Sequence, residues 1–281
     1  MRRRHGSRKD RGGRSFVTNR NDQGAGDARK EQGSRNPELR GAEMIDRHLA
    51  KLRARDTISP EEEKAIRDSV SGYKDLPADH TLIYPGVDLD HCTLLLSGIM
   101  CRYKDLRGGS RQITELHVAG DFVDLHSFTL KHLDHAIMSL SPCRVAFVPH
   151  ARLREITERF PHLARVYWFA TNLDAAIHRE WTFSLGRRSA RAKLAALFCE
   201  LQLRLQVVGL ADETGYDLPI TQTDLAECTG LTNVHVNRTL KDLRESDLVN
   251  FRSGRVTILD LPKLRRAGEF DPSYLYLDGR R

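Results

Sequence analysis

Side chains able to read DNA bases gather in one short stretch near the carboxyl end of the chain. Arg can bond to both major-groove acceptors of guanine, Asn can pair with adenine, and Val can contact the thymine methyl group. Lys holds phosphates, which gives affinity without sequence information. A helix beginning near residue 233 would present such residues on its outer side and flanks: Asn233, Val234, His235, Asn237, Arg238 and Lys241. The spacing therefore predicts a helix that enters a DNA groove.

The residues before this helix predict a shorter helix and a tight turn. Thr221 is a good N-cap, and Asp224 can return the second hydrogen bond of a capping box. Gly230 stands where the chain must turn sharply, and Thr232 can cap the next helix. The inner side of that next helix carries three apolar residues that must pack inward: Val236, Leu240 and Leu243.

A short hairpin is predicted directly after the two helices. Residues 248–259 alternate in polarity and break at Ser253-Gly254, the pattern of two strands joined by a tight turn. An ordinary helical hairpin with a solvated polar face is the alternative, but it leaves the capped turn and the wing unexplained. Together these features predict a winged helix-turn-helix that binds double-stranded DNA.

The string Leu-Thr-Asn-Val-His-Val-Asn-Arg-Thr-Leu, residues 231–240, resembles the Crp/Fnr family of bacterial transcription regulators. The similarity extends back to about residue 75, through a sensor segment around Gly120-Asp121-Phe122 and a long connecting helix. The resemblance implies a homodimeric, cytoplasmic regulator with RNA polymerase as a partner. It places the base-reading positions on Asn233, Val234 and Arg238. Typical members carry Arg or another polar residue and then Glu at the first two, so the operator sequence is not implied.

The net charge of +7 is concentrated at the N-terminus. Residues 1–40 hold ten Arg and two Lys against three Asp and two Glu, and the remaining residues hold 33 basic and 33 acidic groups. Global basicity is therefore no evidence for DNA binding, which rests on the local pattern. The basic tail contains few large apolar residues, so we expect it to be disordered and without a role in operator binding.

Composition argues against several other classes of protein. No run of eighteen apolar residues occurs, and no apolar core follows the basic start, so neither a membrane span nor a secretory signal is expected. The five cysteines are scattered and form no Cys-x-x-Cys pair, which favours reduced thiols in the cytoplasm. No cysteine precedes Cys92, so the iron–sulfur cluster that part of the family holds on N-terminal cysteines is not expected.

The rest of the chain predicts an α+β protein. Residues 42–54 and 60–70 look helical, and short apolar runs between about 75 and 148 predict an antiparallel β-roll, similar to a cyclic-nucleotide-binding domain. The expected divisions are a disordered basic tail (1–41), a helical lead-in with the β-roll sensor (42–150), a long dimerisation helix (151–186), the winged helix-turn-helix domain (187–270) and a C-terminal tail (271–281).

An apolar seam runs along the long helix predicted over 161–185. Steps of three and four residues are typical of the stripe that two parallel helices share, and packing against the helix's own domain is the alternative. We interpret the stripe as a homodimer seam made by Leu163, Val166, Ala170, Leu173, Ile177 and Trp181. Gly186 is the expected hinge before the next helix, predicted over 188–206.

The expected effector segment departs from the cyclic-nucleotide pattern of the family. Binders resemble one another in a Gly-Glu-Leu turn followed by Arg-Ser, whose Arg neutralises the phosphate. No Arg occurs between Arg111 and Arg144, although a protonated His135 could partly substitute. Ordinary cyclic AMP binding is therefore not expected, and the cofactor, if one is needed, is left open. The residues expected at the effector site are Gly120, Asp121, Asp124, Leu125, His126, Ser127 and His135.

Four histidines fall in one region of the predicted roll: His117, His126, His132 and His135. Their spacing matches no standard metal motif, so we expect structural roles and no metal site, with a haem- or metal-responsive regulator as the alternative. A metal-dependent enzyme that uses these histidines is disfavoured, because no nucleophile–base spacing, phosphate loop or paired metal motif accompanies them. The sequence predicts a regulator and not an enzyme.

Overall fold

Both helices expected before the roll are present in the computed structural model, which describes residues 37–277. Helix α1 spans Pro37–Arg53 and helix α2 spans Pro60–Asp68. A capping box starts α2: the Glu62 amide donates to the Ser59 hydroxyl at 3.2 Å, and the Ser59 amide donates to the Glu62 carboxylate at 2.9 Å. The predicted basic tail lies almost entirely outside the described residues.

Two antiparallel sheets form the β-roll that the sequence predicts. One sheet has the strand order β1-β7-β3, and the other has the order β2-β6-β4-β5. Side chains such as Leu95, Met100, Ile137 and Val145 are fully buried between them. The strands span Gly72–Leu76 (β1), His80–Ile83 (β2), His91–Ser97 (β3), Met100–Asp105 (β4), Arg111–His117 (β5), Ala136–Ser139 (β6) and Cys143–Pro149 (β7), with the short helix α3 (Ser127–Leu130) between β5 and β6.

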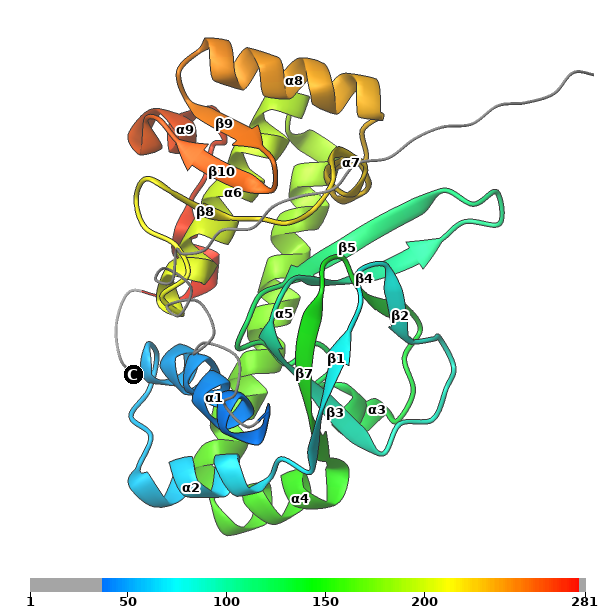
Figure 1. Ribbon diagram of the computed structural model, residues 1–281, viewed down its shortest axis with the longest axis vertical. Coiled ribbons are helices and arrows are strands. Elements are labelled where there is room, and N and C mark those ends of the chain that lie inside the picture. The colour runs from blue at the N-terminus through cyan, green and yellow to red at the C-terminus, as the bar shows by residue number, and fades with distance from the viewer. Residues whose placement is uncertain (1–36, 278–281) are drawn as a thin grey trace, which may run out of the picture. The chain divides into compact units, whose positions relative to one another are not determined.

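The segment expected to be one dimerisation helix over 151–186 contains two helices, α4 (His150–Arg159) and α5 (Pro161–Arg187). Phe160 separates them with φ −123° and ψ 85°, because a residue before proline avoids the α conformation. The helix predicted over 161–185 is confirmed and runs beside the roll (Figure 1). The hinge expected at Gly186 is wrong: Gly186 lies inside α5, and the helix ends at Arg187 because Ser189 caps the next helix.

The winged domain follows as predicted. Its helices are α6 (Ala190–Val207), α7 (Gln222–Thr229), α8 (Asn233–Glu245) and α9 (Leu261–Ala267). Its strands β8 (Gly215–Asp217), β9 (Val249–Arg252) and β10 (Arg255–Ile258) pair in the order β8-β10-β9. Gly215 permits the close pairing, since a Cβ there would lie 2.1 Å from the Val256 carbonyl oxygen. None of the described helices is long and apolar enough to span a membrane.

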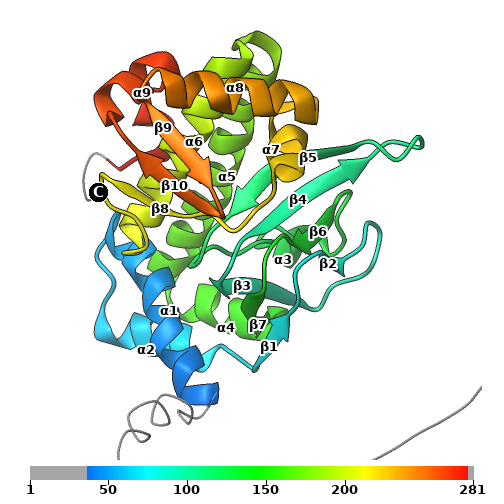
Figure 2. The same cartoon turned by 45° about the horizontal axis from the view of Figure 1, so that its top comes forward.

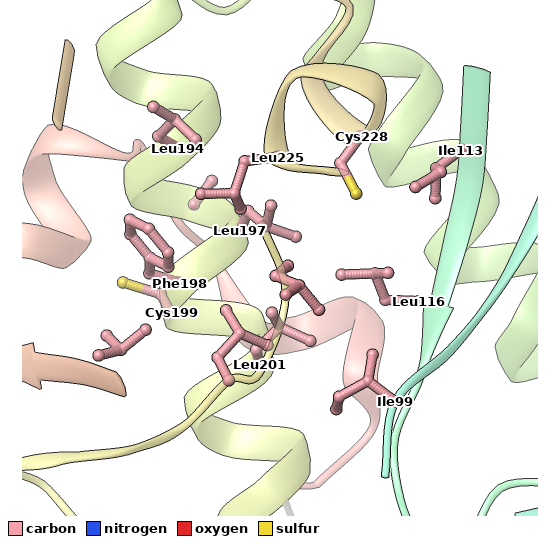
Figure 3. Close-up of a cluster of buried hydrophobic side chains, with 14 of the residues drawn as sticks. Ile99, Ile113, Leu116, Leu194, Leu197, Phe198, Cys199, Leu201, Leu225 and Cys228 are labelled. Carbon is pink, nitrogen blue, oxygen red and sulfur yellow. The ribbon is translucent and has the colours of Figure 1, made fainter. Parts of the chain in front are cut away.

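One buried cluster joins the roll to the winged domain. Figure 3 shows apolar side chains from both gathered together, including Ile99, Ile113, Leu116, Leu197, Leu201, Leu225 and Cys228. At the edge of this cluster, the Gln112 side chain of β5 donates to the Glu227 carbonyl oxygen at 2.6 Å. Helix α7 therefore lies directly beside β5, as both ribbon views show (Figures 1 and 2).

The expected C-terminal tail over 271–281 is ordered structure as far as the described residues reach. A 3₁₀ helix, η1, spans Pro272–Leu275. Leu275 is fully buried, and the Tyr274 hydroxyl donates to the Glu200 carboxylate at 2.7 Å. The apolar Leu275 and the paired Tyr274 explain why this segment packs on α5 and α6 rather than remaining a tail.

Candidate nucleic-acid interface

The turn between α7 and α8 is held by the caps that the sequence predicts. The Asp224 amide donates to the Thr221 hydroxyl at 3.1 Å, and the Thr221 amide donates to the Asp224 carboxylate at 2.6 Å. Gly230 ends α7 in the left-handed region at φ 63°. The His235 amide then donates to the Thr232 hydroxyl at 3.2 Å and starts α8.

Helix α8 has one buried and one exposed face. Val236 and Leu243 are fully buried and Leu240 is nearly so, which confirms the inner side predicted from periodicity. On the opposite side Val234 is 82% exposed, far more than an anchored apolar residue. His235 on the flank is half-buried. The other outward side chains are exposed: Asn233, Asn237, Arg238 and Lys241. An exposed Val beside exposed Arg and Asn side chains fits the edges of bases in a groove.

The side chains predicted to read bases are available to a partner. Within the part of the chain that the structure describes, Arg238 has no hydrogen bond or ion pair. Asn233 donates only to the exposed Thr223 hydroxyl at 3.2 Å, and Lys241 lies 3.7 Å from Glu245. Arg238 is therefore free to contact DNA, and Asn233 and Lys241 can each exchange a weak surface contact for a contact to DNA.

Sequence reasoning missed the residues at the start of α6. A groove beside α8 is lined by Ser189 and Arg191 together with His235, Arg238 and Asp242. Arg191 bonds to Asp242 at 2.9 Å, which brings a further cation next to the reading face. The available signal was the Ser189 cap, which places the positive end of the α6 dipole at this groove.

The hairpin after α8 is a wing. Strands β9 and β10 meet at Ser253 and Gly254, whose φ angles of 50° and 72° are those of a tight hairpin turn. Arg252 and Arg255 flank the turn and are exposed, and Arg255 pairs with Asp217 at 2.8 Å. The predicted hairpin over 248–259 is confirmed.

The comparisons with known proteins match both halves of the described chain. A model of the Crp-like helix-turn-helix domain matches residues 192–267, and a model of the cyclic nucleotide-binding domain matches residues 73–160. The nitrogen fixation regulation protein FixK of Bradyrhizobium diazoefficiens is 32% identical over 171 residues, which cover 59% of this chain and 69% of FixK. This chain belongs to the Crp/Fnr family of transcription regulators. It is a DNA-binding regulator, and members of the family are not enzymes.

Further relatives agree with this assignment. The transcriptional activator protein FnrL of Cereibacter sphaeroides is 29% identical over 210 residues, covering 72% of this chain and 83% of FnrL. The solved structure of FixK2 from Bradyrhizobium japonicum has a TM-score of 0.64 at 21% identity, covering 70% of this regulator and 96% of FixK2. The regulator CLP of Xanthomonas campestris has a TM-score of 0.57 at 13% identity, covering 72% of this chain and all of CLP. The two structures support the fold alone.

The seam predicted on α5 faces this regulator's own chain. Ala170 is half-buried. The large members of the predicted seam are all buried within the described chain: Leu163, Val166, Leu173, Ile177 and Trp181. They pack in the clusters of the roll and the winged domain, and the Trp181 indole donates to Glu200 at 3.0 Å. The residues assigned to the seam therefore hold α5 to its own domains, because a period of three and four marks any buried side of a helix.

A second stripe of α5 is exposed. Beginning at Trp168, which is 70% exposed, exposed residues recur at steps of four and three: Trp168, Asn172, Ala175, Arg179, Thr182 and Gly186. Phe183 beside it is 49% exposed. This spacing is that of a coiled-coil seam, and a large exposed Trp on it with an exposed Phe beside it is unusual for a surface that stays in water.

The expected effector residues are largely used in internal contacts. Gly120 has φ 92° and packs against α1, and Asp121 pairs with Lys51 and, at 3.0 Å, with Arg204. Ser127 bonds to His150 at 3.2 Å, and Leu125 is buried. His126 and His135 stack loosely, with ring centroids 5.3 Å apart.

A buried ion cluster, which the sequence analysis did not identify, fills the space between the roll and α5. Arg102 of β4 is 2% exposed and bonds to Glu115 and to Asp174, each at 2.8 Å. His178 of α5 also lies 2.8 Å from Glu115. Burial opposes the charged form, but Arg102 and the histidines hold the pKa of Glu115 well below its usual range. The cluster ties the sensor strands to the connecting helix.

The four histidines of the roll do not converge. His117 is buried in the ion cluster and His132 is exposed, and ring contact joins only His126 and His135 of the four. Among the described residues no three His, Cys, Asp or Glu side chains are grouped as metal ligands. All five cysteines are buried and free, and burial raises the pKa of Cys143 to about 11 and that of Cys199 to about 12. Raised pKa values disfavour the reactive thiolate.

Asp124 makes the stability of the folded protein depend on pH. Its side chain is fully buried, which raises its pKa to about 7, although it accepts from the Thr93 amide at 2.5 Å. The folded state keeps this proton up to about pH 7, whereas the unfolded chain loses it near pH 4. The contribution of Asp124 to stability therefore falls as pH rises between these values.

We predict that Asp124→Asn removes this dependence. The measured quantity is the difference in the free energy of unfolding, the unsubstituted protein minus the variant. This difference is expected to fall by about 2–3 kcal/mol from pH 5 to pH 8. Urea unfolding of both proteins at four pH values measures the difference. A difference that stays constant with pH would contradict the raised pKa.

Proposed function

We propose that this regulator acts as a homodimer that reads a two-part operator with one α8 from each protomer. The observation that carries the proposal is the exposed face of α8, where Val234 is 82% exposed while the opposite face is buried. Two recognition helices spaced one helical turn apart can enter successive major grooves. RNA polymerase is the partner proposed at the promoter, on the basis of family membership alone.

The outward residues of α7 and α8 divide into two roles in this proposal. Asn233, Val234 and Arg238 read base edges, because they lie on the exposed side at or after the helix start. The remaining polar groups hold phosphates or fix the helix ends: Thr221, Thr232, His235, Asn237 and Lys241. The groove at Ser189 and Arg191 adds a further phosphate contact.

The dimer interface in this proposal is the exposed stripe of α5, from Trp168 to Gly186. Supporting it are the coiled-coil spacing and the exposure of Trp168 and Phe183. The stripe lies on the helix that leads directly into α6, so its geometry sets the spacing of the two α8 helices.

We propose that signalling does not use cyclic AMP in the ordinary way. No Arg lies between Arg111 and Arg144, and the buried Arg102 already bonds to Glu115 and Asp174. The cations beside Asp121, Lys51 and Arg204, are likewise paired with that carboxylate. A phosphate placed here would have to displace two carboxylates from Arg102. A metal- or haem-responsive regulator is less well supported, because only His126 and His135 of the roll's histidines are in ring contact, and no third ligand joins them among the described residues.

We predict that Arg238→Ala loses base discrimination while Lys241→Ala does not. Selection from a random duplex library with the purified protein would supply the operator, and gel shifts would compare it with single-base variants. Arg238→Ala is expected to reduce discrimination at one base pair of each half-site by about 1–3 kcal/mol. Lys241→Ala should weaken operator and random DNA to a similar extent.

The matched pair makes the assignment testable. Both side chains are exposed on one helix, so neither substitution should unfold the domain. If Arg238→Ala weakened operator and random duplexes equally, its role as a base reader would be wrong. If the unsubstituted protein preferred no sequence, the whole proposed function would fail.

A further inference from the structure

A cavity of about 370 Å³ lies between α1, the start of the expected effector segment and α5. Its volume falls within the roughly 300–1,000 Å³ of small-molecule sites, and a mainly apolar wall is typical of them. The cavity reaches Gly120, Asp121 and Leu125 but not His126, Ser127 or His135, so it differs from the site that the sequence predicts. The apolar wall is made by Leu52, Phe122, Leu125, Val166, Phe169 and Leu173.

His48 lines this cavity with one ring nitrogen unused. The side chain is buried, and its Nδ1 lies 2.9 Å from the Gly120 carbonyl oxygen. A carbonyl only accepts, so Nδ1 carries the proton of the neutral ring, and burial lowers the pKa of His48 to about 4. Nε2 is therefore an acceptor, and it has no hydrogen-bond partner among residues 37–277. A buried acceptor without a partner favours a ligand that brings an O–H or N–H group.

Not every cation around the cavity has a carboxylate partner within the described chain. Arg55 donates to the carbonyl oxygens of Lys51 and Leu275, and its Nε is buried without a partner in the described chain. Arg165 lies at the rim and is exposed. In contrast, the carboxylates of the lining are all paired: Asp56 with His162, Asp121 with Lys51 and Arg204, and Asp174 with Arg102. The free charge of the site is positive.

We propose that this cavity binds a small organic acid that combines an apolar body, one carboxylate and one hydroxyl or N–H group. The carboxylate pairs with Arg55, and Arg165 adds positive charge at the rim. The donor group bonds to Nε2 of His48 once the ring turns toward the cavity, because this atom has almost no exposed surface in the present conformation. The apolar body packs between Phe122 and the side chains of α5.

Two contacts connect the cavity to the DNA-reading half. Asp121, which lines the cavity, pairs with Arg204 of α6 at 3.0 Å. Arg165, at the rim, precedes Trp168, where the exposed stripe of α5 begins. A ligand at this place would therefore affect both the dimer seam and α6. This regulatory consequence rests on the proposed function, whereas binding of the acid does not.

Isothermal titration calorimetry on the full chain without DNA tests the proposal with two probes, 4-hydroxycinnamate and indole-3-acetate. Each has an apolar ring system, a carboxylate and one donor group. At least one is expected to bind with a Kd below about 1 mM. The methyl ester of each acid, and 4-methoxycinnamate, should bind at least about tenfold more weakly, because they lack the charge or the donor.

Variants of the protein locate the site. His48→Phe keeps an aromatic ring but removes the acceptor, and Arg55→Gln removes the cation; each is expected to weaken binding at least about tenfold. Arg154→Gln, an exposed Arg of α4 away from the cavity, is the matched control and should change nothing. If His48→Phe fails to fold, the comparison of 4-hydroxycinnamate with 4-methoxycinnamate still tests the donor.

Three results would overturn the proposal. The first is that neither acid binds with a Kd below about 1 mM. The second is that the methyl esters bind as tightly as the acids. The third is that titration with hemin gives the Soret band of a bound haem and that His48→Phe removes this band, which would assign Nε2 to a metal. None of these results affects the DNA selection experiment. Conversely, a failure of DNA binding would leave the calorimetry interpretable.

Discussion

Ala175→Glu is expected to convert the dimer that we propose into a monomer and to lower operator affinity at least about 100-fold. Ala175 lies in the middle of the exposed stripe of α5, where two parallel helices would place two new carboxylates against each other. A monomer engages only one half-site and loses the gain of a second, linked contact, which is typically about 10²–10⁴-fold. Analytical ultracentrifugation measures the mass, and gel shifts on the selected operator measure the affinity.

The control for this prediction is a Glu introduced elsewhere on the surface. Arg154→Glu on α4 is exposed and lies off the stripe, so the protein should remain dimeric and bind the operator normally. Circular dichroism of Ala175→Glu should be unchanged, since Ala175 makes no buried contact. If Ala175→Glu sediments as a dimer with normal operator affinity, the seam lies on another surface.

The proposed position of the seam differs from the one predicted on the buried side of α5, and this shows where sequence reasoning reaches its limit. Steps of three and four correctly identified the buried side of α5, from Leu163 to Trp181. A period reports that a helix side avoids water, but it does not report what covers that side. Here the roll and the winged domain cover it, and the second stripe, with Asn172 and Arg179, is too polar to be recognised from periodicity alone.

Helix α8 and the turn before it were predictable because their determinants are local. The caps at Thr221 and Thr232 and the left-handed Gly230 are set by neighbours within a few residues, and all three occur as expected. The exposure of Val234 follows from the helix period once the start of α8 is known. The domain matches then agree with an assignment that rests on these residues.

The sensor site was less predictable because it depends on contacts between distant segments. Arg102 lies 72 residues before its partner Asp174 on α5. Glu115 lies 63 residues before its partner His178 on the same helix. No pattern in the strand Met100–Asp105 marks Arg102 as buried rather than exposed. The role of His48 likewise depends on the Gly120 carbonyl oxygen, 72 residues away.

Arg102→Met is expected to destabilise the folded protein by about 3–5 kcal/mol. Arg102 is 2% exposed and is the hydrogen-bond donor to two carboxylates, Glu115 and Asp174, at 2.8 Å each. Removing one partner of a buried ion pair leaves charge uncompensated in a medium of low polarity, which costs more than the pair contributed. Met fills a similar volume, so the loss reports charge rather than a cavity.

An exposed ion pair on the same strand supplies the contrast. Lys104 of β4 lies 2.6 Å from Asp134, but the two side chains are 55% and 77% exposed. Lys104→Gln should therefore cost less than about 1 kcal/mol. Urea unfolding at pH 7 compares both variants with the unsubstituted protein. Because strand and partner chemistry are similar, equal losses would mean that burial does not govern the strength of the Arg102 cluster. A small loss for both would also remove the argument that this cluster ties the roll to α5.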